Sequence, residues 1–267
     1  MAKSFAVLGS PISHSKSPAI HEAAYQALGL PWSYGRFEVD VAGLRTFLET
    51  TDLSGASLTM PLKDDTFSMV SVADPDALAA RAVNTIVRAE HGWLGFNTDV
   101  FGIKQALLGV EATRVLILGS GATARNAILA LAAELPEASV TVVGRSKDKV
   151  QRVVDFAKGR GVEAATTKLP VALADYDLTV STLPPKVSVE GWFTGHATGT
   201  LFDVAYNPWP SQLAERWAGD GANLISGIEM LVWQAIAQIR IFLNGNVAEP
   251  LPEEETLAAV MRQAAEG

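Results

Sequence analysis

A glycine-rich segment between a strand pattern and a helix pattern constrains the fold of this 267-residue chain most strongly. An apolar strand pattern covers residues 114–118, and a helix pattern covers residues 124–135. The segment around and between them matches G-x-G-x-x-A and consists of Gly119, Ser120, Gly121, Ala122, Thr123 and Ala124. The first glycine permits a tight turn, the second lets the backbone approach a pyrophosphate, and the small last residue allows close packing of a helix whose N-terminus faces the phosphates. In this context the motif predicts dinucleotide binding, and a plain glycine turn is the alternative.

The next strand pattern covers residues 139–143, and the residues that follow it indicate which dinucleotide is bound. An NAD site usually has Asp or Glu there, which binds the ribose hydroxyl. This chain has Gly144 followed by Arg145, Ser146 and Lys147. A guanidinium and a hydroxyl at this place suit a 2′-phosphate, so the sequence favours NADP. The alternative is that Ser146 only caps the next helix beside solvated charges.

Strand and helix patterns alternate along the chain. The first series has strand patterns at residues 5–8, 34–39 and 56–59, helix patterns at residues 18–28 and 41–50, and a hairpin pattern over residues 82–88 and 92–96. The second series begins after residue 101, with strand patterns at residues 114–118, 139–143, 178–181 and 201–204 and helix patterns at residues 124–135 and 147–158. A long helix follows at residues 227–243. The acidic residues 253–255 could open a terminal helix, and a solvated surface patch is the alternative. The alternation predicts an α/β fold of two βαβ domains with largely parallel sheets.

Composition excludes several classes of protein. With 48% hydrophobic and 19% charged residues, the chain is not broadly disordered, and its net charge of −8 argues against binding of a nucleic-acid backbone. It contains no cysteine, which excludes a disulfide scaffold, a thiol nucleophile and an iron–sulfur cluster and fits a cytoplasmic location. Its four histidines lack metal-ligand spacing, so we expect no metal site. No apolar run is long enough for a membrane span, so we expect a soluble protein.

Three hydroxyls follow the first strand pattern on alternate residues, at Ser13, Ser15 and Ser17. In an extended segment they would share one side, next to the N-terminus of the helix that begins at Pro18. Such a cluster could bind a small carboxylate. The alternative is that Ser17 only caps this helix, and the spacing leaves both interpretations open.

Lys63 follows a turn, and residues 95–99 end in Asn-Thr-Asp. Reduction of a carbonyl needs a hydride donor and a group that passes a proton to the developing alkoxide. A lysine can pass this proton, and a nearby carboxylate such as that of Asp99 can orient it. The alternatives are a surface lysine and a capping turn.

Six segments match motifs of one known family, in the family's order. They are residues 9–18 (GSPISHSKSP), 58–63 (LTMPLK), 82–85 (AVNT), 95–102 (GFNTDVFG), 203–208 (DVAYNP) and 227–234 (GIEMLVWQ). On these motifs the chain resembles the shikimate dehydrogenase family from about residue 7 to residue 245. The resemblance implies an oxidoreductase that reversibly reduces 3-dehydroshikimate to shikimate with NADPH, on the route to chorismate and the aromatic amino acids.

The resemblance also implies roles for individual residues. Lys63 and Asp99 would form the catalytic pair, with Lys63 handling the proton. Ser15 and Ser17 would hold the substrate carboxylate, with Tyr206 close by. The residues that would bind ring hydroxyls are Thr59, Asn84, Asp99 and Gln234.

A division into two domains is implied as well. Residues 1–100 plus 227–267 would form the substrate-binding domain, and residues 101–226 the Rossmann-like NADP-binding domain, with the active site in a cleft between them. The expected partner is a small anionic substrate, without nucleic acid or membrane, and the chain would act as a monomer or homodimer.

Three departures from the family's patterns bear on specificity. Many members have Asn at the position of Ser57, and an aromatic residue or His at that of Leu62. Gly144 replaces a frequent Asn before Arg145. One alternative is therefore an NAD-preferring quinate/shikimate dehydrogenase. A second alternative is a non-catalytic, nucleotide-sensing regulatory protein on the same fold.

Overall fold

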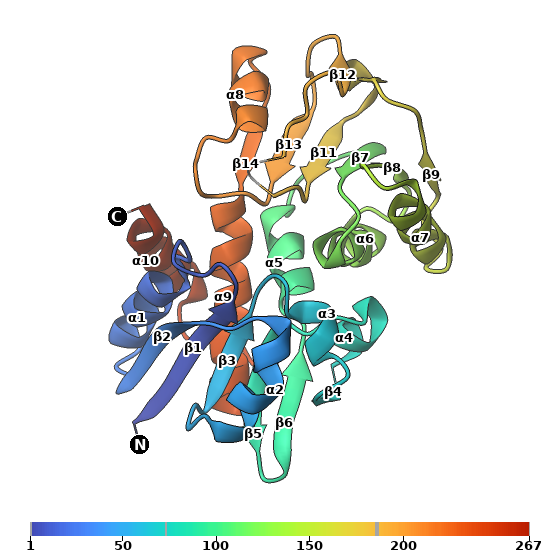
Figure 1. Cartoon of the computed structure of the whole chain (residues 1–267). Coiled ribbons are helices and arrows are strands. Elements are labelled where there is room, and N and C mark those ends of the chain that lie inside the picture. The colour runs from blue at the N-terminus through green and yellow to red at the C-terminus, as the bar shows by residue number, and fades with distance from the viewer. Residues whose placement is uncertain (1, 73, 185–186, 267) are drawn as a thin grey trace. The chain divides into compact units, whose positions relative to one another are not determined.

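The structure is a computed structural model that describes residues 2–72, 74–184 and 187–266 (Figure 1). The chain divides into two compact units, the first of Met1–Gly102 and Leu231–Gly267 and the second of Ile103–Met230. It passes between the units within two helices, α5 (Asp99–Ala106) and α9 (Gly227–Asn244). Each unit contains a six-stranded sheet, which confirms the predicted α/β fold.

The sheet of the first unit has the strand order β2-β1-β3-β5-β6-β4. Its strands are β1 (Lys3–Gly9), β2 (Trp32–Glu38), β3 (Gly55–Leu58), β4 (Ser71–Val72), β5 (Thr85–Ala89) and β6 (Gly92–Phe96). Strand β1 is parallel to β2 and β3, whereas β5 is antiparallel to both β3 and β6. Strands β1, β3 and β6 therefore run in the same direction, and their carboxyl ends lie at one edge of the sheet (Figure 1).

The predicted hairpin is present as β5 and β6, but its first strand starts later than expected. A strand from residue 82 is wrong, because β5 begins at Thr85. The backbone N–H of Val83 donates to the carbonyl of Lys63 at 2.9 Å instead of extending the ladder. Residues 82–84 thus form a turn that brings two distant parts of the chain together.

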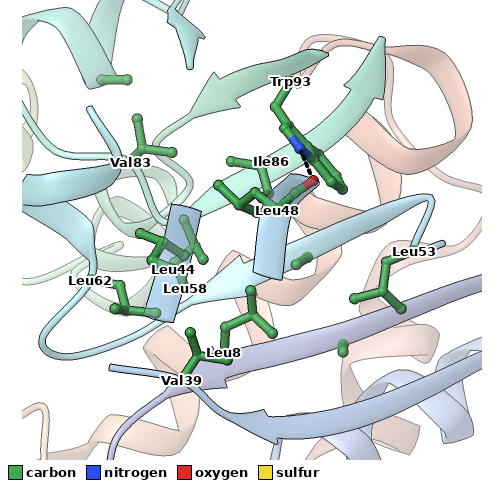
Figure 2. Close-up of a cluster of buried hydrophobic side chains, with 13 residues drawn as sticks. Leu8, Val39, Leu44, Leu48, Leu53, Leu58, Leu62, Val83, Ile86 and Trp93 are labelled. Atoms are coloured by element: carbon green, nitrogen blue, oxygen red, sulfur yellow. Dashed lines mark hydrogen bonds between the residues drawn. The ribbon is translucent and has the colours of Figure 1, made fainter. Parts of the chain in front are cut away.

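Helices and apolar side chains cover both faces of the first sheet. The helices that lie wholly in this unit are α1 (Ser17–Ala27), α2 (Val41–Thr50), α3 (Lys63–Thr66), α4 (Pro75–Ala80) and α10 (Glu254–Glu266). On one face, Leu8 of β1 belongs to the cluster around α2, in which the Trp93 indole donates to the Leu48 carbonyl at 3.1 Å (Figure 2). On the other face, Phe5 stacks on Phe242 of α9 with ring centroids 4.2 Å apart. Burial on both faces explains why β1 is apolar almost throughout.

Side-chain hydrogen bonds hold helices α1 and α10 of the first unit in place. Helix α1 begins at Ser17 itself, and Lys16 is the N-cap residue without a side-chain cap, so the interpretation of Ser17 as a cap is wrong. The Lys16 ammonium instead donates to the Ala265 carbonyl of α10. Helix α10 begins at Glu254, as the helix interpretation of the acidic run required, and this carboxylate accepts two hydrogen bonds from Arg240 at 2.7 and 2.5 Å.

The second unit has an all-parallel sheet in the order β14-β13-β11-β7-β8-β9. These strands are β7 (Arg114–Leu118), β8 (Ser139–Val143), β9 (Ala164–Thr166), β11 (Leu178–Ser181), β13 (Thr200–Asp203) and β14 (Leu224–Ser226). Strands β10 (Val171–Ala172) and β12 (Phe193–Thr194) form a separate pair. The helices of this unit are α6 (Ala122–Glu134), α7 (Lys147–Lys158) and α8 (Gln212–Gly219), and a short 3₁₀ turn covers Leu173–Asp175. The strand order reverses between β7 and β11, which is where doubly wound sheets bind dinucleotides. Among the described residues, none of the helices has the length and apolar character needed to cross a bilayer.

One histidine of the first unit is fully buried, which has a consequence for the stability of the protein in acid. His21 on α1 is fully buried, stacks on the Tyr34 ring at 3.9 Å, and its Nδ1 lies 2.9 Å from the carbonyl of Ser17. Burial disfavours the imidazolium and lowers the pKa of His21 from 6.5 to about 4, against the opposing effect of the Ser17 carbonyl. The unfolded chain therefore binds more protons than the folded chain between these two pH values.

We expect acid to destabilise the protein through His21. The contribution of neutral, buried His21 to the free energy of unfolding is fully present above pH 6.5. It falls by about 3 kcal/mol as the pH decreases towards 4. Urea unfolding at pH 7 and pH 4.5 should show a smaller acid-induced loss for His21→Phe than for the unsubstituted protein. His91→Gln, at an exposed position, is the control and should keep the original loss. An unchanged loss in His21→Phe would contradict the assignment.

Candidate active site

Lys63 and Asp99 form an ion pair at the carboxyl edge of the first sheet. Lys63 follows β3 and begins α3, whereas Asp99 follows β6 and begins α5. The Lys63 Nζ lies 2.6 Å from Asp99 Oδ2, and the side chains are 17% and 0% exposed. A buried carboxylate thus holds an ammonium group that solvent or a small molecule can still reach.

Asn84 connects this pair to a third segment. Its Nδ2 lies 2.8 Å from Asp99 Oδ1 and 3.2 Å from Oε1 of Gln234 on α9. Its Oδ1 accepts a hydrogen bond from the Thr98 backbone N–H at 2.8 Å, which fixes the orientation of the amide. The structure therefore brings four predicted site residues together, from segments that are distant in the sequence.

The neighbours of these residues anchor them in the core. Leu62, before Lys63, and Val83, before Asn84, are both fully buried in the apolar cluster of Figure 2. The backbone bond from Val83 to Lys63 joins the two turns. Because each turn is held by an apolar residue, the adjacent polar side chain has a defined position.

Thr59 lies at the same edge, after β3, and is half-buried. Its backbone N–H donates to the carbonyl of Leu8 at 2.9 Å, so it packs against the end of β1. A Cβ at Gly9 would collide with Thr59 Cγ2 and come within 3.0 Å of the Met60 carbonyl. Gly9 is therefore required for this close approach, a requirement that the sequence interpretation missed.

Ser15 and Ser17 follow β1, the parallel neighbour of β3. Both are 7% exposed, and Ser15 Oγ accepts a hydrogen bond from the Ser17 backbone N–H at 3.3 Å. The prediction of three hydroxyls on one side is wrong for Ser13, which is exposed in a turn closed by the bond from Ser15 N–H to the Ile12 carbonyl at 3.0 Å. Two of the three hydroxyls thus form a buried pair at the start of α1.

Tyr206 lies in the second unit, in the loop that follows β13, and is half-buried. The buried Asp203 holds both ends of this loop, since its carboxylate accepts hydrogen bonds from the Ala205 N–H at 3.2 Å and the Ser211 hydroxyl at 2.5 Å. Burial raises the pKa of Asp203, and these bonds oppose the increase. The loop that carries Tyr206 is therefore closed by one carboxylate.

The glycine-rich loop connects β7 to α6 at the reversal of the second sheet. Gly119 has a φ of +115°, and a Cβ there would collide with the hydroxyl of Thr182, which donates to the Leu118 carbonyl at 2.9 Å. Gly121 is the N-cap residue of α6 and provides no side-chain cap, and a Cβ there would meet no atom within 4 Å. An uncapped helix start beside open space fits the phosphates of a dinucleotide. Helix α6 begins at Ala122, two residues before the predicted start, so Ala122, Thr123 and Ala124 lie in its first turn.

Arg145, Ser146 and Lys147 follow β8 and are all exposed. Ser146 caps α7 by accepting a hydrogen bond from the Lys149 N–H at 3.4 Å, as the alternative interpretation required. This cap leaves the Arg145 and Lys147 side chains at the carboxyl end of β8. Among the residues that the structure describes, no group of three His, Asp or Glu residues could hold a metal ion.

Comparisons with known proteins cover both units. A family model described as Shikimate dehydrogenase substrate binding domain matches residues 7–86, and one described as Shikimate / quinate 5-dehydrogenase matches residues 103–189. The Shikimate dehydrogenase (NADP(+)) of Methanosarcina mazei is 35% identical over 281 residues, which cover 97% of this chain and 99% of that protein. The protein of the same name from Methanosarcina acetivorans is 32% identical over 284 residues, with the same coverage of 97% and 99%.

Solved structures agree over nearly the whole chain. The crystal structure of Mycobacterium tuberculosis shikimate dehydrogenase matches with a TM-score of 0.83 and 37% identity, covering 97% of this chain and 98% of that one. Thermus thermophilus shikimate 5-dehydrogenase, solved in complex with NADP(H) and shikimate, matches with a TM-score of 0.80 and 27% identity, covering 98% and 99%. On this evidence the chain belongs to the shikimate dehydrogenase family.

Proposed function

We propose that this protein is an NADP-dependent shikimate dehydrogenase, which reversibly reduces 3-dehydroshikimate to shikimate on the route to chorismate and aromatic amino acids. The observation that carries the proposal is the cluster of Lys63, Asn84, Asp99 and Gln234 around a 2.6 Å ion pair. This cluster combines a proton donor with groups that can bind hydroxyls, in a chain whose relatives are named for this activity.

The reduction needs a hydride and a proton. NADPH supplies the hydride when it is bound. The Lys63 ammonium donates a proton to the oxygen of the former carbonyl, and the buried Asp99 carboxylate keeps the ammonium in place. The donation leaves a neutral Lys63 amine, which can recover a proton from solvent because Lys63 is partly exposed. In the reverse direction the neutral amine accepts the proton of the shikimate hydroxyl.

The remaining residues bind and orient the substrate in this proposal. Ser15, Ser17 and Tyr206 hold its carboxylate. Thr59, Asn84, Asp99 and Gln234 bind its hydroxyls. The residues that contact NADP are Gly119, Ser120, Gly121, Ala122, Thr123, Ala124, Arg145, Ser146 and Lys147. We assign residues 1–100 and 227–267 to the substrate-binding domain and residues 101–226 to the NADP-binding domain.

We also propose a cytoplasmic enzyme whose partner is a small anionic substrate. The absence of cysteine fits a reducing compartment. A monomer and a homodimer would each contain every proposed site residue, because one chain supplies all of them.

A two-by-two rate assay tests the activity. Initial rates of NADP⁺ and NAD⁺ reduction should be measured with shikimate and with quinate, and shikimate with NADP⁺ should be the fastest combination. Dominance of quinate with NAD⁺ would favour the quinate dehydrogenase, whose specificity would then trace to Ser57, Leu62 and Gly144. Absence of turnover in all four combinations would reject the proposed activity and would favour either another substrate or a nucleotide-sensing protein.

Removal of the Lys63 ammonium should abolish most of the turnover. We expect Lys63→Ala to lower kcat about 100-fold or more, with the KM for shikimate changed by less than about threefold, because the proton transfer is lost while the binding groups remain. Lys168→Ala, at an exposed lysine of the second unit, is the control and should keep the original kcat. Circular dichroism confirms that both variants are folded, and a folded Lys63→Ala protein with unchanged kcat would refute the proton-transfer role.

Reversal of charge at Arg145 should affect the two cofactors differently. We expect Arg145→Asp to raise the KM for NADPH about tenfold or more and to change the KM for NADH much less, because only NADPH has a 2′-phosphate. Lys158→Asp makes the same change of charge at the other end of α7 and should leave the ratio of the two KM values unchanged. Equal losses for both cofactors in Arg145→Asp would mean that Arg145 does not contact the 2′-phosphate.

A further inference from the structure

Asp74 has a contact that its role as a helix cap does not require. It precedes α4, and its Oδ2 accepts a hydrogen bond from the Ala77 N–H at 2.8 Å, which caps the helix. The same oxygen accepts a second bond from the backbone N–H of Asn97, also at 2.8 Å. Burial raises the pKa of Asp74, and the N–H donors of Asn97 and Ala77 oppose the increase. One partly buried oxygen therefore joins α4 to the segment that follows β6.

The second bond leads directly to the candidate catalytic pair. Asn97 is 3% exposed, and its Oδ1 accepts a hydrogen bond from the Asp99 backbone N–H at 3.2 Å. Asp99 is the first residue of α5, and its carboxylate contacts Lys63 and Asn84. Asp74 is thus connected to the backbone of Asp99 through a single intervening residue.

The segment from Asn97 to Asp99 is held from two directions. Asn84 contacts it through the Thr98 N–H and the Asp99 carboxylate. Asp74 contacts it through the Asn97 N–H. Asn84 belongs to the proposed binding residues, whereas Asp74 contacts only backbone groups in these bonds. A substitution at Asp74 can therefore change the position of the segment and leave the proposed substrate-binding side chains intact.

We propose that Asp74 is a positioning residue, which fixes the 97–99 segment and thereby places the Asp99 carboxylate against Lys63 and Asn84. This role rests on the proposed function of Lys63 and Asp99. A displaced Asp99 carboxylate would orient the Lys63 ammonium less well, and a displacement of this kind lowers the rate of the chemical step more than the binding of the cofactor.

Two substitutions separate the helix cap from the positioning contact. Asp74→Asn keeps a side-chain oxygen at the same reach, and since both N–H groups donate to one oxygen, it can retain both bonds. Asp74→Ser keeps a good N-cap residue, but its side chain is one bond shorter and is expected to lose the bond to Asn97. Asp40→Ser is the matched control, because Asp40 caps α2 through the Gly43 N–H at 2.8 Å.

The measurements are kcat, the KM for NADP⁺ and the thermal midpoint, with shikimate as substrate. We expect Asp74→Ser to lower kcat about tenfold with the KM for NADP⁺ unchanged, and Asp74→Asn and Asp40→Ser to stay within about twofold of the original kcat. Hydrogen exchange of the amides at residues 97–99 should be faster in Asp74→Ser and unchanged in Asp40→Ser.

Three results would overturn the proposal. The first is a folded Asp74→Ser protein whose kcat equals that of the unsubstituted protein. The second is a loss of kcat in Asp74→Asn as large as that in Asp74→Ser, and the third is a loss of the same size in Asp40→Ser. If the unsubstituted protein does not turn over shikimate with NADP⁺, the proposed function itself fails. In that case hydrogen exchange still decides whether Asp74 holds the segment, because this measurement does not depend on activity.

Discussion

A fully buried carboxylate, that of Asp99, is the constraint on which the arrangement of the first unit depends. A buried charge is costly unless it is paired and hydrogen-bonded, and here Lys63 Nζ and Asn84 Nδ2 lie 2.6 and 2.8 Å from its two oxygens. These partners come from turns after β3 and before β5. The sheet must therefore bring these turns together before the charge can be tolerated.

Strand direction makes this possible. Strands β1, β3 and β6 run the same way, so the segments that follow them meet at one edge of the sheet. The buried residues Leu62 and Val83 then anchor the turns that carry Lys63 and Asn84. The apolar core and the polar site therefore depend on each other, because the same turns contribute side chains to both.

The sheet of the second unit differs from that of the first, because all of its strands are parallel. Its strand order reverses between β7 and β11, and Gly119 makes room for Thr182 at this point. The start of α6 is left without a side-chain cap, which suits a phosphate group. Thus in both units the proposed site residues lie at the carboxyl ends of the strands, as the side chains of Lys63 and Asp99 in the first unit and as the glycine-rich loop in the second.

The elements whose signals are local could be predicted from the sequence. The apolar run of β7 and the Ser-capped helix α7 have the predicted bounds, because hydrophobic periodicity and capping act over a few residues. The motifs also predicted Lys63, Asn84, Asp99 and Gln234 as a set, through resemblance. The sequence did not predict that Ser13 is exposed or that the Asp74 carboxylate accepts a hydrogen bond from the Asn97 N–H. These outcomes depend on the packing of turns and strand ends against one another, which no local pattern specifies.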